Sequence, residues 1–202
     1  MNIIKYPSIE TWPELVKRPH LDVSQLNVTV KRVLDDVRQQ GDEAVKNYEQ
    51  KFDHAVLTSL AVSEEEIDEA MTLVSTELLD SLKLAHENIY KFHCAQKFKG
   101  ISLETSKGVE CWQKSVPIQK VGLYIPGGTA PLFSTVLMLA TPAKIAGCDE
   151  IVLCTPPNKE GKVNPAILAA AKIAGVSRIF KVGGVQASGG MAYGTESVPK
   201  GY

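Results

Sequence analysis

Apolar residues in the first hundred positions recur at helical spacing. One stripe consists of Val30, Val33, Leu34 and Val37. Gly41 follows it at the place of a helix-ending residue. Further along, a longer pattern contains Ile67, Ala70, Met71, Val74, Leu78, Leu79, Leu82, Ala85 and Ile89. These patterns predict amphipathic helices that bury one face against another part of the molecule, and nothing in them demands chemistry.

Two residues in this region are expected to begin helices. Asp42 is placed to cap a short helix whose apolar side carries Ala44, Val45, Tyr48 and Phe52. Ser63 followed by Glu66 is a capping-box signature, because each side chain can satisfy a free backbone amide of the other residue. The sequence therefore predicts helix starts at both positions.

The pattern changes after about residue 100. Residues 110–116 look like a strand, and from Lys120 short apolar runs alternate with helical segments. We expect strands at 121–125, 151–154 and 179–182. Each of these strands is followed by a helical segment: one capped by Ser134 or Thr135 and ending at Gly147, one capped by Asn164 with Pro165 at its first position and ending at Gly175, and one running from Gly183-Gly184 to Tyr193.

This alternation predicts an α/β fold: a Rossmann-like open parallel sheet with helices on both faces, preceded by an N-terminal helical region. We place the helical region at residues 1–110 and the α/β domain at residues 111–202. The two parts could share one core or form two lobes. Within the last helix, Ser188-Gly189-Gly190 predicts weakness, because each glycine costs about 1 kcal/mol relative to alanine.

Composition and charge limit the classes of partner that the protein is expected to bind. The net charge of −1 gives no reason to expect nucleic acid or an acidic membrane surface. The N-terminal residues lack the continuous apolar stretch of a signal peptide or spanning helix, so we expect a cytoplasmic protein. The four cysteines show no metal or redox spacing and are expected to be buried free thiols: Cys94, Cys111, Cys148 and Cys154.

Two glycine pairs follow predicted strands. Gly127-Gly128 comes after the first strand and Gly183-Gly184 after the third. Ligands of open α/β sheets bind beyond the carboxyl ends of the strands, where glycine lets the backbone approach closely. Neither pair has the spacing of a full dinucleotide fingerprint, so a plain tight turn is the simpler explanation of each pair taken alone.

Tyr124 and Gln186 strengthen the case for a ligand site. Tyr124 closes the first strand just before the first glycine pair, where its ring could lie against a planar ligand. Gln186 opens the last helix just after the second pair, where its amide would face the same crevice. A half-buried tyrosine and a solvated helix start are the alternatives.

At these residues the sequence closely resembles histidinol dehydrogenases. The resemblance covers essentially the whole chain and is clearest in five stretches: residues 41–53 (GDEAVKNYEQKFD), 92–97 (FHCAQK), 121–157 (beginning VGLYIPGG), 179–187 (IFKVGGVQA) and 191–200 (MAYGTESVPK). The YIPGG and GTESVP blocks are the most specific.

The resemblance implies a function. Members of that family oxidise L-histidinol to L-histidine through an aldehyde, in two NAD-dependent steps of histidine biosynthesis. They are zinc-containing homodimers built on Rossmann-like domains. Two NAD-contacting positions of the family fall on Tyr124 and Gln186. A third, an asparagine in a Gly-Pro-Gly-Asn loop, has no counterpart in a chain that ends at Tyr202.

The resemblance also predicts what these 202 residues do not contain. The family's zinc ligands, its Glu-His catalytic pair and most of its substrate contacts belong to the following half. We therefore assign no catalytic or metal-binding residue here, and the four histidines receive no such role: His20, His54, His86 and His93. The chain alone is expected to be inactive.

Two alternatives to an enzyme remain open. The chain could be a truncated or engineered non-enzymatic α/β domain that folds, self-associates and binds nucleotide weakly. Apolar surface left by a missing half would drive such association. A flavodoxin-like phosphate-binding or signalling domain also fits the loop positions, but it explains neither the N-terminal helices nor the block resemblance.

Overall fold

A three-stranded parallel sheet forms the centre of the molecule. The computed structural model describes residues 3–18, 24–127 and 130–201. The sheet has the order β3-β4-β5 and consists of β3 (Lys120–Tyr124), β4 (Glu150–Thr155) and β5 (Arg178–Lys181). All three predicted strands are confirmed to within one residue at each end.

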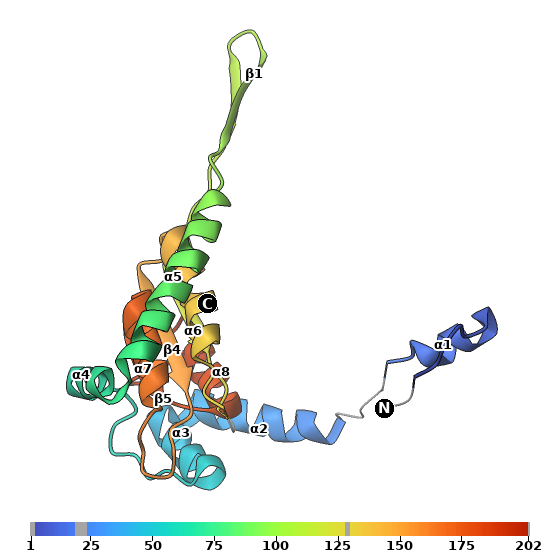
Figure 1. Ribbon diagram of the computed structural model, residues 1–202. Coiled ribbons are helices and arrows are strands. Elements are labelled where there is room, and N and C mark those ends of the chain that lie inside the picture. The colour runs from blue at the N-terminus through green and yellow to red at the C-terminus, as the bar shows by residue number, and fades with distance from the viewer. Residues whose placement is uncertain (1–2, 19–23, 128–129, 202) are drawn as a thin grey trace.

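Two crossover helices connect the strands. α6 (Phe133–Ala146) joins β3 to β4, and α7 (Pro165–Ala174) joins β4 to β5. Because the strands are parallel and adjacent in sequential order, crossovers of one hand place both helices on the same face of the sheet. That face is completed by α4 (Glu64–Leu73) and α5 (Thr76–Ala95), which pack against α7 and α6 (Figure 1).

The opposite face is covered by a second set of helices. It consists of α2 (Ser24–Gln40), α3 (Asp42–Tyr48), the π-helical turn η2 (Glu49–Asp53) and α8 (Gly184–Tyr193). Successive residues of β4 point alternately to the two cores: Ile151 and Leu153 join the α4–α7 cluster, while Val152 and Cys154 join the cluster with α2 and α8. The predicted open sheet with helices on both faces is confirmed.

Helices from the first half of the chain thus lie on both faces of the sheet. Each hydrophobic cluster contains residues from before and after position 110. The boundary placed between residues 110 and 111 stays a prediction.

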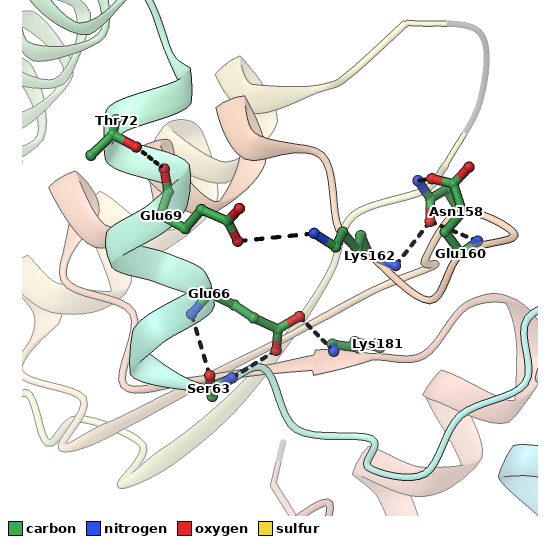
Figure 2. Close-up of polar contacts among 8 residues, drawn as sticks. All are labelled: Ser63, Glu66, Glu69, Thr72, Asn158, Glu160, Lys162 and Lys181. Carbon is green, nitrogen blue, oxygen red and sulfur yellow. Dashed lines mark hydrogen bonds and ion pairs between the residues drawn. The ribbon is translucent and has the colours of Figure 1, made fainter.

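The segment before α4 covers the free edge of β5. Ala61 forms an antiparallel bridge with Phe180, and the amide of Lys181 donates to the carbonyl of Leu60 at 2.7 Å. The predicted capping box follows directly, since the Glu66 amide donates to Ser63 Oγ at 3.3 Å and the Ser63 amide donates to Glu66 Oε2 at 3.0 Å (Figure 2). Lys181 also pairs with Glu66 at 2.7 Å, which ties this helix start to the sheet.

An antiparallel hairpin projects beyond the end of α5. It consists of β1 (Ile101–Ser106) and β2 (Val109–Gln113), and all residues of both strands are exposed (Figure 1). The predicted strand at 110–116 corresponds to β2, whereas β1 had no sequence prediction. At the other end of the chain, η1 (Ile9–Thr11) and α1 (Trp12–Leu15) contain no buried residue. None of the described helices has the length and apolar character needed to span a membrane.

Several local predictions are confirmed at helix ends. Asn164 caps α7 by accepting from the amide of Ala166 at 2.9 Å, with Pro165 at the first position. Gly147 and Gly175 end α6 and α7 in the left-handed conformation that glycine adopts easily. The predicted thiol burial is confirmed for Cys148 and Cys154 but is wrong for Cys94 and Cys111, which are exposed.

Two predicted caps are wrong. α6 begins after Leu132 with no side-chain cap, so neither Ser134 nor Thr135 serves. Gly41 precedes α3, and the Asp42 side chain makes no capping bond. The Asp42 carboxylate instead accepts hydrogen bonds from distant residues, as described below.

The glycine pair in α8 has a packing role. α8 is continuous over Gly184–Tyr193. A Cβ atom on Gly189 would lie 3.3 Å from the side chains of Leu34 and Val37 on α2. The missing side chain therefore lets α2 and α8 approach closely, and tertiary packing offsets the low helix propensity of this segment.

Candidate functional site

The candidate site is a cavity at the carboxyl edge of the sheet. Its volume is about 840 Å³, within the range of roughly 300–1,000 Å³ typical of small-molecule sites. The walls come from the loops after β3 and β4, the first turn of α8, the start of α2 and η2. This is where open α/β sheets bind ligands, because strand ends and helix starts meet there.

Both predicted site residues line this cavity. Tyr124 is the last residue of β3, and Gln186 lies in the first turn of α8. Their elements are connected directly, since the backbone amide of Gly184 donates to the Tyr124 hydroxyl at 3.0 Å. Burial raises the pKa of Tyr124, and the nearby Asp53 and Glu49 carboxyls add to that shift.

The glycine turns meet at a proline. A Cβ atom on Gly127 would lie 2.5 Å from Pro156 Cγ, and one on Gly183 would lie 2.7 Å from Pro156 Cβ. Both distances are shorter than any side chain tolerates, so Pro156 requires glycine at both positions. The turns after β3 and β5 are therefore neighbours across the loop after β4. Gly128 and Thr129 lie outside the described residues.

Contrary to the prediction from the sequence, the side chain of Gln186 does not face an open crevice. Its side chain is completely buried, and its Nε2 donates to Glu49 Oε1 at 2.8 Å. The same oxygen accepts from the backbone amide of Gly183 at 2.8 Å. The Oε1 atom of Gln186 is buried without a hydrogen-bond partner in the described part of the chain.

Glu49 is the residue that sequence reasoning missed. It is completely buried, and burial raises the pKa of its carboxyl to about 7, even though hydrogen bonds from Gln186 and Gly183 act in the opposite direction. Asp53, one helical turn later on η2, lines the cavity and raises the pKa of Glu49 further. A signal was present, because Glu49 lies four residues after Val45 and three before Phe52 on the apolar side of the predicted helix.

A second polar cluster fixes the segment after α8. Asp42 accepts from Thr195 Oγ1 at 2.5 Å and from the Ser197 amide at 3.1 Å, and it also bonds the Ser197 hydroxyl. In return, Glu196 accepts from the backbone amide of Asp42 at 2.8 Å. The GTESVP block thus has a structural role: it fastens the start of α3 to the end of α8.

The described residues do not fit a zinc site. No group of three or more His, Cys, Asp or Glu residues in the ranges 3–18, 24–127 and 130–201 is arranged to hold a metal ion. His86 and His93 lie on α5, where the ring of His86 is 6.1 Å from that of Tyr90. His20 lies outside the described residues.

Comparison with known proteins agrees with the resemblance of these sequence stretches to histidinol dehydrogenases. The sequence model of the family "Histidinol dehydrogenase" matches residues 16–202. A histidinol dehydrogenase of Bacteroides thetaiotaomicron is 61% identical over 100% of this chain and 47% of its own length. The histidinol dehydrogenase of Escherichia coli K12 is 50% identical over 93% of this chain and 42% of its own length.

A solved structure has the same fold. The crystal structure of histidinol dehydrogenase from Elizabethkingia anophelis superimposes with a TM-score of 0.93 and 47% identity, covering 96% of this chain and 45% of that one. The chain spans about half the length of the relatives it matches. By its sequence and its fold, the chain belongs to the histidinol dehydrogenase family.

Proposed function

We propose that the protein serves NAD-dependent oxidation of L-histidinol to L-histidine, by way of the aldehyde, in the cytoplasm. These 202 residues contribute part of the NAD site, while zinc, the catalytic pair and most substrate contacts come from family segments outside them. NAD supplies the hydride acceptor of such a reaction when it is bound. Family membership supports the activity, and the cavity at the sheet edge supports the cofactor.

One observation carries the cofactor proposal. Tyr124 and Gln186, which are 62 positions apart in the sequence, line the same cavity at the carboxyl ends of parallel strands. The half-buried Tyr124 ring and the exposed Phe52 ring offer flat apolar surfaces for a base or a nicotinamide. The buried, unpartnered oxygen of Gln186 is an acceptor that an amide or hydroxyl donor would satisfy.

NAD titration of the chain by calorimetry tests this proposal. We expect measurable binding that Tyr124→Ala weakens by about tenfold, because a buried aromatic contact contributes on the order of 1 kcal/mol or more. Tyr90→Ala is the matched control, since that exposed tyrosine lies on α5. Binding that Tyr124→Ala and Gln186→Ala both leave unchanged would refute the assignment of the site.

An activity assay tests the division of labour. With NAD, zinc and L-histidinol, the 202 residues should show no turnover, because the resemblance places the catalytic pair outside them and no group of the described residues could hold a metal ion. Production of NADH above the background without protein would contradict the proposal.

We also propose that the chain associates with a second copy. The β1–β2 hairpin carries apolar side chains exposed by half or more: Ile101, Leu103, Val109 and Trp112. Such an arm favours a partner surface that removes it from water. Light scattering decides the point, because the proposal requires a mass above that of one chain. A non-enzymatic domain would self-associate through the same hairpin, so light scattering does not distinguish it from part of an enzyme. The NAD titration does, because only part of a dehydrogenase is expected to bind NAD in the way described above.

A further inference from the structure

We propose that Glu49 is a positioning residue for the dinucleotide site. One of its carboxyl oxygens holds the Gly183 turn and the Gln186 amide in place, while the other shares a single proton with Asp53. This inference rests on the proposed NAD function for its ligand, but its geometric part stands on the protein alone.

One carboxyl oxygen of Glu49 holds two hydrogen-bond donors of α8 and the turn before it. Glu49 Oε1 accepts from the Gly183 amide and from Gln186 Nε2, both at 2.8 Å. It thereby fixes the entry of α8, whose next amide, that of Gly184, donates to Tyr124. The glutamate therefore connects both predicted ligand-contacting residues to one buried anchor, and it does so from outside the cavity lining.

The orientation of Gln186 follows from the same contacts. Because its Nε2 donates to Glu49, its Oε1 lies on the other side, where a Cβ atom on Gly184 would be 2.8 Å away. Only glycine at position 184 leaves room for this oxygen. Gln186 is thus set to act as a hydrogen-bond acceptor beneath the turn that lines the cavity.

The other carboxyl oxygen of Glu49 has a different environment. Oε2 is buried and receives no N–H or O–H donor from the described residues. The carboxyl of Asp53 lies beside it, because both groups adjoin Gly183: the Gly183 amide donates to Glu49, and a Cβ atom on Gly183 would be 3.1 Å from Asp53 Oδ2. Two neighbouring buried carboxyl groups cannot both ionise at low cost, so the pair retains one proton. A proton on Oε2, donated to Asp53, satisfies the buried oxygen.

The surroundings favour retention of that proton at neutral pH. The groups that face the pair are Tyr124 from β3, Cys154 from β4 and His54 at the end of η2. His54 acts against retention, because it lowers the pKa of Asp53, but burial outweighs it and the pKa of Asp53 is raised. Burial raises the pKa of Cys154 to about 12, and the pKa of Tyr124 is also raised, so both stay neutral. The α8 start contributes only amides.

A single proton matters for an anionic ligand. With the proton present, the pair carries one negative charge beside the cavity; without it, the pair carries two. A diphosphate bound nearby is repelled more strongly by two charges than by one. NAD affinity should therefore fall as pH rises through about 7, where Glu49 loses its proton.

The test measures NAD affinity against pH in matched variants. Glu49→Gln keeps an acceptor for Gly183 and Gln186 and imitates the protonated acid, because its amide can donate to Asp53. We expect the wild-type chain to bind about threefold or more weakly at about pH 8 than at about pH 6. Glu49→Gln should bind as the wild type does at the lower pH and show no such loss. Glu77→Gln, at an exposed site on α5, should retain the wild-type profile.

A second variant, Glu49→Ala, tests whether the hydrogen bonds of Glu49 position the site. Glu49→Ala should weaken binding by about tenfold at both pH values, because it removes a charge-assisted acceptor. A pH dependence that survives in Glu49→Gln, or wild-type affinity in Glu49→Ala, would overturn the inference.

NMR of the free chain keeps the inference distinct from the proposed function. The backbone amide of Gly183 and the side-chain amide of Gln186 should titrate with a midpoint near 7 in the wild type, and not in Glu49→Gln. If the chain binds no NAD, the proposed function fails, and this titration alone judges the positioning role. Signals independent of pH in the wild type would contradict it.

Discussion

The two faces of the sheet are built differently. The face under α4, α5, α6 and α7 is an apolar core, whose buried members include Leu82, Leu137 and Leu153. The face under α2, α3 and α8 has a smaller apolar core and adds buried polar contacts between residues more than 130 positions apart, such as Glu49 with Gln186. We expect the first face to contribute most of the stability, whereas the second also borders the candidate ligand site.

The apolar face should give the largest loss on truncation. Leu153 in β4 is completely buried in that core. Leu153→Ala removes buried methyl groups and leaves a cavity, so we expect the free energy of unfolding to fall by about 3 kcal/mol. Urea denaturation followed by circular dichroism measures it. A loss below about 1 kcal/mol would show that this face is not the main source of stability.

The polar contacts of the other face should contribute less, and with a pH signature. Burial tends to raise the pKa of Asp42, but the hydrogen bonds from Ser197 and Thr195 outweigh it, so the pKa is lowered. A lowered pKa in the folded state means stability that is present above the unfolded pKa of about 3.9 and lost as pH falls through the folded value. Asp42→Ala should cost about 2 kcal/mol at neutral pH and much less in strong acid.

Denaturation of wild type and Asp42→Ala at several pH values checks this. Glu43→Ala, at the adjacent exposed position of α3, is the control and should be near neutral. A difference between wild type and Asp42→Ala that does not shrink in acid would argue against an ionised Asp42 as the bonded form.

Glu49 should show the opposite sign. Its pKa is raised to about 7, so the folded protein holds a proton that the unfolded chain releases near pH 4.3. Stability should therefore decline as pH rises between these values. Glu49→Gln should remove this decline and gain about 1–2 kcal/mol relative to wild type between about pH 5 and about pH 8. Parallel pH profiles for the two proteins would contradict the buried-acid interpretation.

The smallest effect is expected at the contact between α2 and α8. A Cβ atom on Gly190 would meet Val198 at 3.7 Å, an ordinary contact, whereas one on Gly189 would press on α2 at 3.3 Å. Gly190→Ala should stabilise by about 0.5–1 kcal/mol through helix propensity. Gly189→Ala should gain less or lose stability, because α2 must move. Thermal melts of both variants rank them, and equal gains would show that the helices are not in close contact here.

Features that depend on residues close together in the sequence could be predicted from it. Asn164 and Pro165 at the start of α7, Ser63 with Glu66 at the start of α4, and Gly147 at the end of α6 act within a few residues, so local pattern found them. The strands and the α/β class follow from alternation of apolar runs, for the same reason.

One error concerns a residue that acts across the molecule. Asp42 looks like a cap, but its carboxylate bonds Thr195 and Ser197 more than 150 positions away. β1 is a different case: Ile101-Ser102-Leu103-Glu104 alternates apolar and polar residues, but the alternation is short and both of its faces are exposed.

The candidate site was predictable only in part. Tyr124 and Gln186 were found because both flank glycine turns after strands. Glu49 and Asp53 escaped, because η2 reaches the cavity only through the packing of the helical region on the sheet.

We propose that a nicotinamide dinucleotide binds between the turns after β3 and β5. NMR of the labelled chain during NAD titration tests it most directly. We predict that the largest amide shifts occur at Gly127, Thr155 and Gly184, with the β1–β2 hairpin unchanged. Shifts centred instead on the cavity between α5 and the hairpin, near His93 and Lys97, or no shift at millimolar NAD, would contradict the claim.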